Sequence, residues 1–420
     1  MRSDRFFPHL SEPNAALTRA EKGGPLKKMF VLRSCLSVCL LAGVAPVLVA
    51  QAAASAGSTG ADANKALVHD TAAGYIANNQ KIVTSHGIEE SVLVPINGIK
   101  QALLIRGRDT RNPVLLYLHG GPGTPFMPLA WTVESPWEDY FTVVQWDQRG
   151  AGKTYAANDP AVVAPTMNIA QMTSDTAEVV RYLQEHLHKK KVIVVGHSWG
   201  SVLGVALAQQ HPEWLYAYVG VGQFVSSRRN EEDGYRYAVE QAKASGNVTA
   251  EKELEAIAPY PGDVNQLGFD KIGVERKWLT TFGGVVNGRQ DQSFEDGVSM
   301  LSPAYTLHDM DAADEGTMFS VAHLIRALLN VDYTTTTNFK CPVFVFAGRH
   351  DYATSHELAH EWFTQVKAPA KGFVWFENSG HLVPEEEPGR FLHHLVTDVR
   401  PLAVQEGDAP PTDLEGVQHP

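Results

Sequence analysis

The pattern of apolar and polar positions predicts alternating strands and helices over most of the chain. Residues 113–118, 140–146, 216–221 and 342–347 are short and nearly continuous apolar runs, which are typical of strands buried on both faces. Residues 173–187 instead carry their apolar side chains at helical spacing. Two further β-rich runs, residues 90–96 and 99–106, flank Asn97-Gly98, a dipeptide that predicts a tight hairpin. This alternation predicts an α/β protein with a mostly parallel sheet flanked by helices.

The pattern changes between residues 223 and 338. Amphipathic stretches at 230–244, 249–258 and 315–329 dominate there, glycine-rich segments separate them, and buried strand runs are missing from this part of the sequence. We therefore predict a helical cap over residues 223–338, inserted into a core made of residues 57–222 and 339–400. Since ligands of α/β sheets bind beyond the carboxyl ends of the strands, the cap is expected to roof the site. Its aromatic residues Trp278, Phe282 and Phe319 are expected to line the pocket.

Both ends of the chain have a different composition. In residues 1–56, Lys27, Lys28 and Arg33 precede an apolar run of about 16 residues that contains Pro46 and ends in A-x-A patterns. This layout predicts a secretory signal, with Met29 as an alternative start, because the run is shorter than the roughly 20 residues that span a membrane. We therefore expect an exported protein without a membrane anchor after cleavage. Residues 401–420 carry four acidic residues, four prolines and no Lys or Arg, and they are predicted to be a disordered tail.

The net charge and the cysteine content of the chain limit its possible partners and disulfides. The whole chain has a net charge of −12 and residues 1–56 carry +4, which leaves −16 on residues 57–420. Such an acidic chain does not favour nucleic acid as a partner. Cys341 is the single cysteine beyond residue 56, so no disulfide can form within that part of the chain. The oligomeric state stays open.

The strongest chemical signal is Gly196-His197-Ser198-Trp199-Gly200, a G-x-S-x-G motif. An apolar β-branched run precedes it, and small and apolar residues at helical spacing follow it. A serine in this strand–turn–helix context is held in a strained turn that exposes its hydroxyl, and the flanking glycines allow strand and helix to pass closely. We therefore predict that Ser198 is a nucleophile.

Further residues complete the predicted site. Asp351 follows the penultimate strand and His381 follows the last one, so the chain order is serine, aspartate, histidine, which is the order of α/β-hydrolases. His381 would act as general base and Asp351 would orient it. The glycine-rich loop after the strand at 113–118 contains Gly121, and the N–H groups of Gly121 and Trp199 are predicted to form an oxyanion hole.

One rival motif lies close to Asp351. Residues 356–360 read H-E-L-A-H, and two histidines one helical turn apart beside a glutamate can bind zinc in a metalloprotease. The helix that would carry them starts just after Asp351, where an α/β-hydrolase has an outer helix. We therefore interpret the pattern as accidental, with both histidines facing solvent, and predict no metal and no other cofactor.

Four motifs together resemble one branch of the α/β-hydrolases. H-G-G-P-G at 119–123, D-Q-R-G at 147–150, G-H-S-W-G at 196–200 and the late Asp351 and His381 are similar to the proline iminopeptidases, serine peptidases that remove an N-terminal residue. The resemblance covers most of residues 85–400. It implies Ser198, Asp351 and His381 as the triad, with Gly121 and Trp199 at the oxyanion.

The expected activity is hydrolysis of an amide or ester through an acyl-enzyme. An aminopeptidase acting on a short peptide or other small molecule is our first hypothesis, and it needs an acidic residue to bind the substrate's amine. Glu231 and Glu232 are the first candidates, and Glu275 is a third. A carboxylester or lactone hydrolase is the alternative, and a non-catalytic receptor on the same fold is a third hypothesis.

Overall fold

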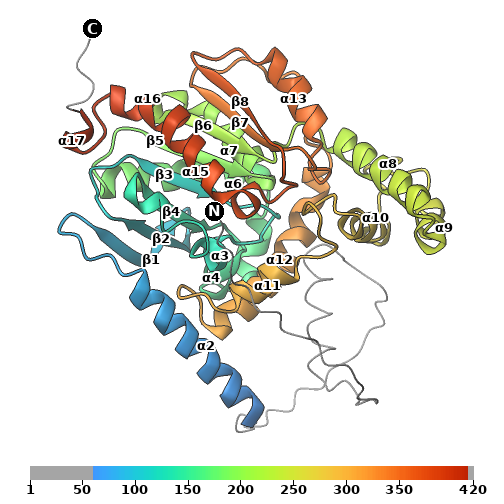
Figure 1. The fold of residues 1–420 in the computed structure, drawn as a ribbon, viewed down its shortest axis with the longest axis horizontal. Coiled ribbons are helices and arrows are strands. Elements are labelled where there is room, and N and C mark those ends of the chain that lie inside the picture. The colour runs from blue at the N-terminus through green and yellow to red at the C-terminus, as the bar shows by residue number, and fades with distance from the viewer. Residues whose placement is uncertain (1–59, 415–420) are drawn as a thin grey trace, which may run out of the picture.

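A computed structural model of the protein describes residues 60–414 (Figure 1). The predicted leader, residues 1–56, lies outside the described residues. The sheet consists of β1 (Ile88–Ile96), β2 (Ile99–Gly107), β3 (Val114–Leu118), β4 (Thr142–Asp147), β5 (Val192–His197), β6 (Leu215–Val221), β7 (Val343–Gly348) and β8 (Lys371–Phe376). Its order is β1-β2-β4-β3-β5-β6-β7-β8. The pairs β1–β2 and β2–β4 are antiparallel, and every pair from β4 to β8 is parallel.

The predicted hairpin is confirmed. Ile96 and Ile99 are paired across the turn between β1 and β2. Asn97 and Gly98 have φ values of 44° and 84°, both in the left-handed region that a tight hairpin turn requires. The strand predicted at 140–146 starts two residues later, because Tyr140 caps a preceding 3₁₀ turn.

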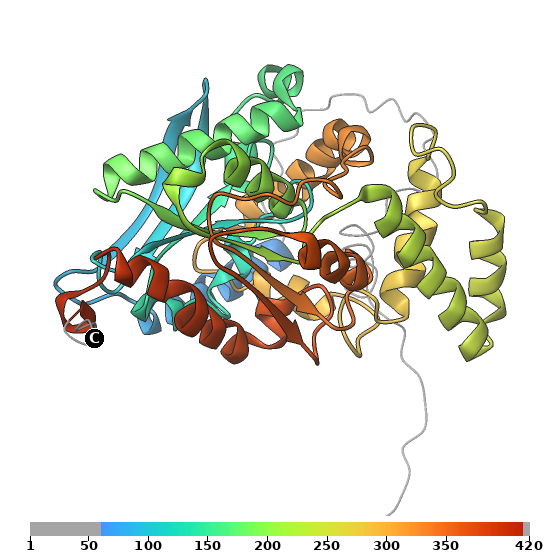
Figure 2. The same cartoon turned by 90° about the horizontal axis from the view of Figure 1, so that it is seen from above.

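Helices cover both faces of the sheet, as Figure 2 shows. Successive side chains of the central strands point to opposite faces of the sheet. Leu116 and Val194 pack in one apolar cluster, and Leu115 and Val195 pack in the other. The first cluster includes residues of α6 (Ile169–His186), α7 (Trp199–Gln210) and α13 (His356–Gln365). The second includes residues of α15 (Pro388–His394), the π-helical turn η4 (Leu395–Val399) and α16 (Arg400–Gln405). Two apolar layers around one sheet explain why the strand runs are apolar on both faces.

The remaining elements precede, connect or follow these layers. They are α2 (Gly60–Asn79), α3 (Met127–Ala130), α4 (Gly152–Ala156), α5 (Pro160–Val163), α14 (Val383–Glu386) and α17 (Pro411–Leu414), with 3₁₀ turns η1 (Trp137–Asp139), η2 (Ala164–Thr166) and η3 (Pro212–Trp214). Within residues 60–414, none of the helices combines the length and the apolar character needed to cross a bilayer.

Five helices lie between β6 and β7 in the chain. They are α8 (Ser227–Ser245), α9 (Val248–Ala256), α10 (Phe269–Thr281), α11 (Ser293–Ser299) and α12 (Leu307–Leu328). Figures 1 and 2 show α8, α9 and α10 grouped at one end of the molecule, beyond the sheet. Ala238, Leu254 and Trp278, from these three helices, belong to an apolar cluster of their own. The segment therefore packs partly on itself, and α10 and α11 were not predicted from the sequence.

The C-terminal segment differs from the disordered tail that its composition suggests. Residues 400–405 and 411–414 are helical, and Ala403 and Ala409 are buried. The Arg400 guanidinium donates to the carbonyl of Tyr140 at 3.0 Å and to Oδ1 of Asn112 at 2.9 Å, which ties this segment to the core. Specific packing against the sheet thus outweighs the low hydrophobicity on which the prediction depended.

Candidate active site

Ser198 lies at the turn between β5 and α7. Its backbone has φ 54° and ψ −120°, a conformation that costs a non-glycine residue about 1–3 kcal/mol. Close packing enforces the turn: a Cβ on Gly200 would lie 2.0 Å from the carbonyl oxygen of Leu118, and one on Gly196 would lie 2.7 Å from that of Gly200. The N–H of Ser198 donates to the carbonyl of Val221 at 2.9 Å. The structure therefore has the strained strand–turn–helix geometry that the motif predicts.

His381 and Asp351 are brought together by the ends of β7 and β8. Nδ1 of His381 lies 2.8 Å from Oδ2 of Asp351. The other Asp351 oxygen accepts from the N–H groups of Ala353 and Thr354 at 3.0 and 2.9 Å. Burial alone would raise the pKa of the Asp351 carboxyl, but His381 and the Thr354 donors outweigh it and hold that pKa below its usual value. Asp351 therefore stays ionised and can orient the imidazole.

Two neighbours of this pair were missed by the sequence analysis. Gly222, just after β6, has φ 51°, and a Cβ there would lie 2.8 Å from Nδ1 of His381 and 3.2 Å from Oδ2 of Asp351. Nε2 of His197 lies 2.9 Å from the carbonyl oxygen of His381, and burial lowers the pKa of His197 to about 3. A glycine directly after a buried strand was the available signal for Gly222, but only the tertiary structure shows what it faces.

The two predicted oxyanion donors come from neighbouring loops. Gly121, between β3 and α3, and Trp199, the first residue of α7, line the same cavity as Ser198 and His381. A Cβ on Gly120 would lie 3.3 Å from the Cβ of Ser198, so this backbone passes directly beside the serine. The structure thus brings Ser198, His381, Asp351 and both predicted donors into one region.

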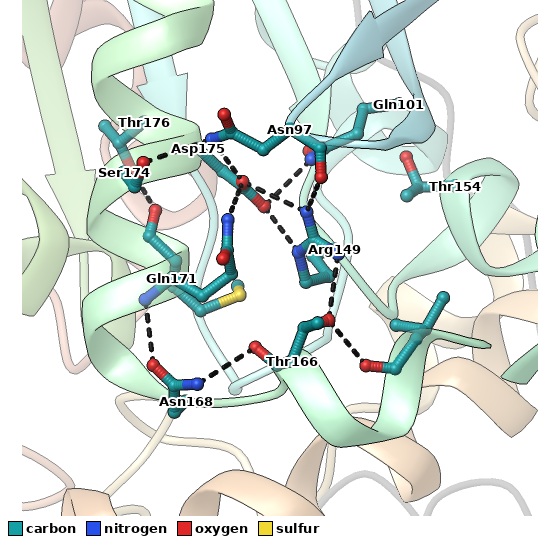
Figure 3. Close-up of polar contacts among 12 residues, drawn as sticks. Asn97, Gln101, Arg149, Thr154, Thr166, Asn168, Gln171, Ser174, Asp175 and Thr176 are labelled. Atoms are coloured by element: carbon teal, nitrogen blue, oxygen red, sulfur yellow. Dashed lines mark hydrogen bonds and ion pairs between the residues drawn. The ribbon is translucent and has the colours of Figure 1, made fainter. Parts of the chain in front are cut away.

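The D-Q-R-G segment, which begins at the last residue of β4, contributes one partner of a buried ion pair. Arg149 and Asp175 form an ion pair in which both side chains are at most 1% exposed. Figure 3 shows the pair surrounded by amides: Asn97, Gln101 and Gln171 donate to the Asp175 carboxylate at 2.8–2.9 Å. Arg149 also donates to the carbonyl of Asn97 and to Oγ1 of Thr166. The network joins the β1–β2 turn, α6 and the D-Q-R-G loop.

The same loops bind the cap. Oγ of Ser320, on α12, donates to the carbonyl of Gly150 at 2.9 Å, and Oγ1 of Thr317 donates to that of Gly123 at 2.8 Å. The Tyr305 hydroxyl, just before α12, donates to Oδ2 of Asp147. Helix α12 is thereby attached to both glycine-containing loops of the core.

Core and cap together enclose a cavity of about 350 Å³. The core lines it with Gly121, Phe126, Leu129, His197, Ser198, Trp199 and His381, among others. The cap contributes Glu231, Phe269, Ile272, Arg276, Met310, Met318, Val321, Ile325, Leu328 and Leu329, also among others. The cap does roof Ser198, as expected, but the expectation that Trp278, Phe282 and Phe319 line the cavity is wrong. Trp278 and Phe282 pack in the cap's own core, and Phe319 packs on Tyr155.

The two candidate amine ligands have different positions. Glu231 is buried and lines the cavity, where it accepts from the Tyr260 hydroxyl and pairs with Arg276. Glu232 is not among the cavity-lining residues; its side chain is 42% exposed and pairs with Arg228 at 3.0 Å. Glu231 faces the cavity, and Glu232, which points about 100° further round α8, faces solvent. The structure therefore does not bring Glu232 to the site.

Glu275 precedes Arg276 on α10 and forms an ion pair with it. It is fully buried, and its Oε1 has no hydrogen-bond partner in the described part of the chain. Burial raises the pKa of Glu275 to about 7 against the opposing charge of Arg276. Glu231, Glu275 and Arg276 thus form an ionic cluster at the cap side of the cavity.

The H-E-L-A-H pattern lies on α13. His356 is buried, with Nδ1 2.8 Å from the carbonyl oxygen of Asp351, while His360 is exposed and its ring lies against Phe373 and Trp375. The expectation that both histidines face solvent is therefore wrong for His356. Among residues 60–414, His, Cys, Asp and Glu side chains do not gather in any group of three or more suited to a metal ion.

Comparison with known proteins identifies the family. The protein-family model described as "alpha/beta hydrolase fold" matches residues 113–388 of the sequence. The chain is 33% identical over 309 residues to the Bacillus subtilis (strain 168) protein named "Probable aminopeptidase YbaC", covering 73% of this chain and 94% of that protein. The chain belongs to the alpha/beta hydrolase family, which confirms the predicted fold and the predicted enzyme class.

Two further likenesses agree with this assignment. The proline iminopeptidase of Lactobacillus helveticus (strain DPC 4571) is 24% identical over 250 residues, which are 56% of this chain and 79% of that protein. The crystal structure of a membrane phospholipase A matches with a TM-score of 0.50 at 16% identity, covering 86% of this chain and 96% of that one. At that identity the structural match shows the fold alone.

Proposed function

We propose that the protein is a serine aminopeptidase that releases the N-terminal residue of a short peptide through an acyl-enzyme. The observation that carries this proposal is a shared cavity, because Ser198 and His381 at its core side and the buried carboxylate Glu231 at its cap side line the same space of about 350 Å³. The names of the B. subtilis and L. helveticus relatives support the same class of substrate.

The acyl-transfer step follows from the geometry around Ser198. With Nδ1 bound to Asp351, the His381 ring has Nε2 left to accept the hydroxyl proton as Ser198 attacks the carbonyl carbon. The N–H groups of Gly121 and Trp199 stabilise the oxyanion of the tetrahedral intermediate. Imidazolium then protonates the leaving amine, and a water molecule, deprotonated by the same ring, releases the acyl group from Ser198.

Charge balance at the cap side supports recognition of a free amine. Two carboxylates and one guanidinium, from Glu231, Glu275 and Arg276, leave one negative charge when all three are ionised. This condition holds above about pH 7, because burial raises the pKa of Glu275 to about 7. An ammonium group from the substrate would neutralise that charge, whereas an ammonium left unpaired in a closed cavity costs several kcal/mol. Glu231 lines the cavity and Glu275 does not, which makes Glu231 the proposed ligand among the residues predicted from the sequence. Four further acids also line the cavity: Glu295, Asp296, Asp314 and Glu385.

The test compares L-prolyl-p-nitroanilide with its N-acetyl derivative. Wild type should prefer the free amine, and Glu231→Gln should reduce kcat/KM for the free substrate by about tenfold or more, since hydrogen bonds to charged groups contribute about 1.5–3 kcal/mol. Glu232→Gln is the matched control, because it makes the same change one residue away on the exposed side of α8, and it should leave kcat/KM within about twofold of wild type.

The opposite results are equally informative. A free-amine preference that survives Glu231→Gln would eliminate this residue as the ligand. Failure of wild type to prefer the free amine, together with faster turnover of p-nitrophenyl butyrate, would overturn the aminopeptidase proposal in favour of a carboxylester or lactone hydrolase.

We also propose that the protein is exported, on the basis of the basic residues, apolar run and A-x-A patterns in residues 27–56. Cell fractionation and N-terminal sequencing test this proposal. The mature N-terminus should fall between residues 50 and 57, in the periplasmic or culture fraction. A cytoplasmic protein that starts at Met1 or Met29 would contradict export.

A further inference from the structure

The buried histidine of the H-G-G-P-G loop has a single allowed protonation pattern. Nε2 of His119 accepts from the backbone N–H of Gln148 at 3.2 Å, and Nδ1 lies 2.9 Å from the carbonyl oxygen of Gly120. A backbone N–H can only donate, so Nε2 carries no proton and the proton lies on Nδ1, from which it is donated to Gly120. Burial lowers the pKa of His119 to about 4, so the ring stays neutral near pH 7.

This hydrogen bond acts on the peptide unit that contains the predicted oxyanion donor. The carbonyl of Gly120 and the N–H of Gly121 belong to one planar peptide group, and in a trans peptide they point in opposite directions. A donor that holds the Gly120 oxygen therefore also sets the direction of the Gly121 N–H. The N–H of Thr124 is a second donor to the same oxygen, at 3.3 Å.

Gln148, the second residue of D-Q-R-G, connects this loop to the other donor. Its Nε2 donates to the carbonyl of His119 at 3.0 Å, and its Oε1 accepts from the indole Nε1 of Trp199 at 2.9 Å. Gln148 is fully buried, so water cannot replace these bonds without cost. One side chain thus spans the two loops from which Gly121 and Trp199 come.

We propose that His119 and Gln148 are positioning residues for the oxyanion hole: His119 orients the Gly120–Gly121 peptide through its Nδ1–H, and Gln148 fixes the distance between that peptide and Trp199. This inference rests on the proposed function in one respect, the role of Ser198 as nucleophile. It does not depend on whether the substrate is a peptide or an ester.

The first test uses the unmodified protein. Nitrogen-15 NMR of the histidine rings should show His119 as the neutral Nδ1–H form between pH 5 and 8, with its signals assigned by their loss in His119→Asn. A ring protonated on Nε2 would overturn the proposal, because it could not accept from Gln148.

The second test separates the two ring nitrogens. Asn places an amide near the position of Nδ1 and keeps a donor for Gly120, whereas Gln places its amide near Nε2 and loses that donor. The probe is the second-order rate of phosphonylation of Ser198 by a fluorophosphonate, whose phosphoryl oxygen occupies the oxyanion hole. His119→Gln should slow it at least tenfold, since loss of one oxyanion donor costs about 10²–10³-fold. His119→Asn should slow it less than threefold, and equal slowing in both variants would overturn the proposal.

The third test asks whether Gln148 has more than a packing role. Gln148→Leu should lower kcat at least tenfold with KM changed less than threefold, the pattern expected when an interaction specific to the transition state is lost. Gln145→Leu is the matched control, because Gln145 is also buried on β4 but donates to Glu134, outside the two loops that carry Gly121 and Trp199. Both variants should lose comparable stability to urea, but only Gln148→Leu should lose kcat.

The remaining outcomes distinguish the two proposals. Equal kcat in the two leucine variants would overturn the positioning role while leaving the proposed function intact. Wild type that is phosphonylated but cleaves no prolyl substrate would overturn only the aminopeptidase proposal. Wild type that is not phosphonylated at Ser198 would overturn both.

Discussion

The two walls of the cavity are built differently. On the core side, buried hydrogen bonds hold groups beside Ser198: His381 contacts Asp351, and His119 accepts from the N–H of Gln148. On the cap side, apolar residues from α10 and α12 predominate, and polar residues from α8 and α11 join them, including Glu231, which pairs with Arg276, and Glu295, which pairs with Arg289. The rigid core wall suits bond making and breaking, whereas the cap wall suits selection of the substrate.

The difference implies that core and cap substitutions have distinct kinetic signatures. Core variants should reduce turnover of every substrate by a similar factor. Cap variants such as Glu231→Gln should change the ratio between substrates and leave phosphonylation of Ser198 nearly unchanged. A cap variant that slows all substrates and the phosphonate equally would remove the distinction.

The largest effect is expected for Ser198→Ala. By analogy with triad knockouts, kcat should fall about 10⁶-fold for peptide and ester substrates alike, and fluorophosphonate labelling should disappear. EDTA should leave wild-type activity unchanged. If EDTA abolished activity while Ser198→Ala retained it, the catalytic centre would be a zinc site at His356 and His360 instead.

The next largest effect concerns stability of the core. Arg149→Met leaves the Asp175 carboxylate buried without its cation, which should lower the free energy of unfolding by about 3–5 kcal/mol in urea denaturation. The double variant Arg149→Met/Asp175→Leu should regain part of that loss, because no uncompensated charge remains. A single variant as stable as wild type would show that the three amides around Asp175 suffice.

A smaller effect is expected for Gly222→Ala. A Cβ at this position would lie 2.8 Å from Nδ1 of the His381 ring, so the imidazole should shift. A residue other than glycine is also strained at φ 51°. Displacement of a reacting group by about 1 Å can reduce kcat about 10²-fold. The expected result is that loss with KM nearly constant; a change in KM alone would place Gly222 in substrate binding instead.

The last effect is spread over several pH units and concerns Asp147, which links the core to the cap through the Tyr305 hydroxyl. Burial raises the pKa of the Asp147 carboxyl to about 7, although the Tyr305 hydroxyl and Lys153 oppose the shift. The folded protein therefore keeps a proton there that the unfolded chain loses near pH 4, so this group's contribution to stability declines as pH rises from about 4 to 7, by at most about 1.4 kcal/mol per pH unit. Asp147→Asn should remove that part of the decline, as urea midpoints at pH 5, 6 and 7 would measure. Parallel pH curves for wild type and variant would contradict a raised pKa.

The local residue pattern was sufficient to predict elements whose conformation depends on residues close in sequence. Asn97-Gly98 predicted the hairpin, because both positions need positive φ, and the apolar runs predicted the central strands. Pattern failed where packing decides: residues 401–414 look disordered by composition, yet Arg400 and Ala403 fasten them to the core. Helix α10 was missed because its apolar residues face several partners and leave no clear single stripe.

What the sequence by itself determined is the order of strand-end residues, and with it the family and the candidates Ser198, Asp351 and His381, because parallel strands bring their carboxyl ends to one edge of the sheet. The tertiary structure alone decided which of Glu231 and Glu232 faces the cavity and what Gly222, His119 and Gln148 contact. A side chain's direction depends on the rotation of its helix and on neighbours distant in sequence, and no local pattern carries that information.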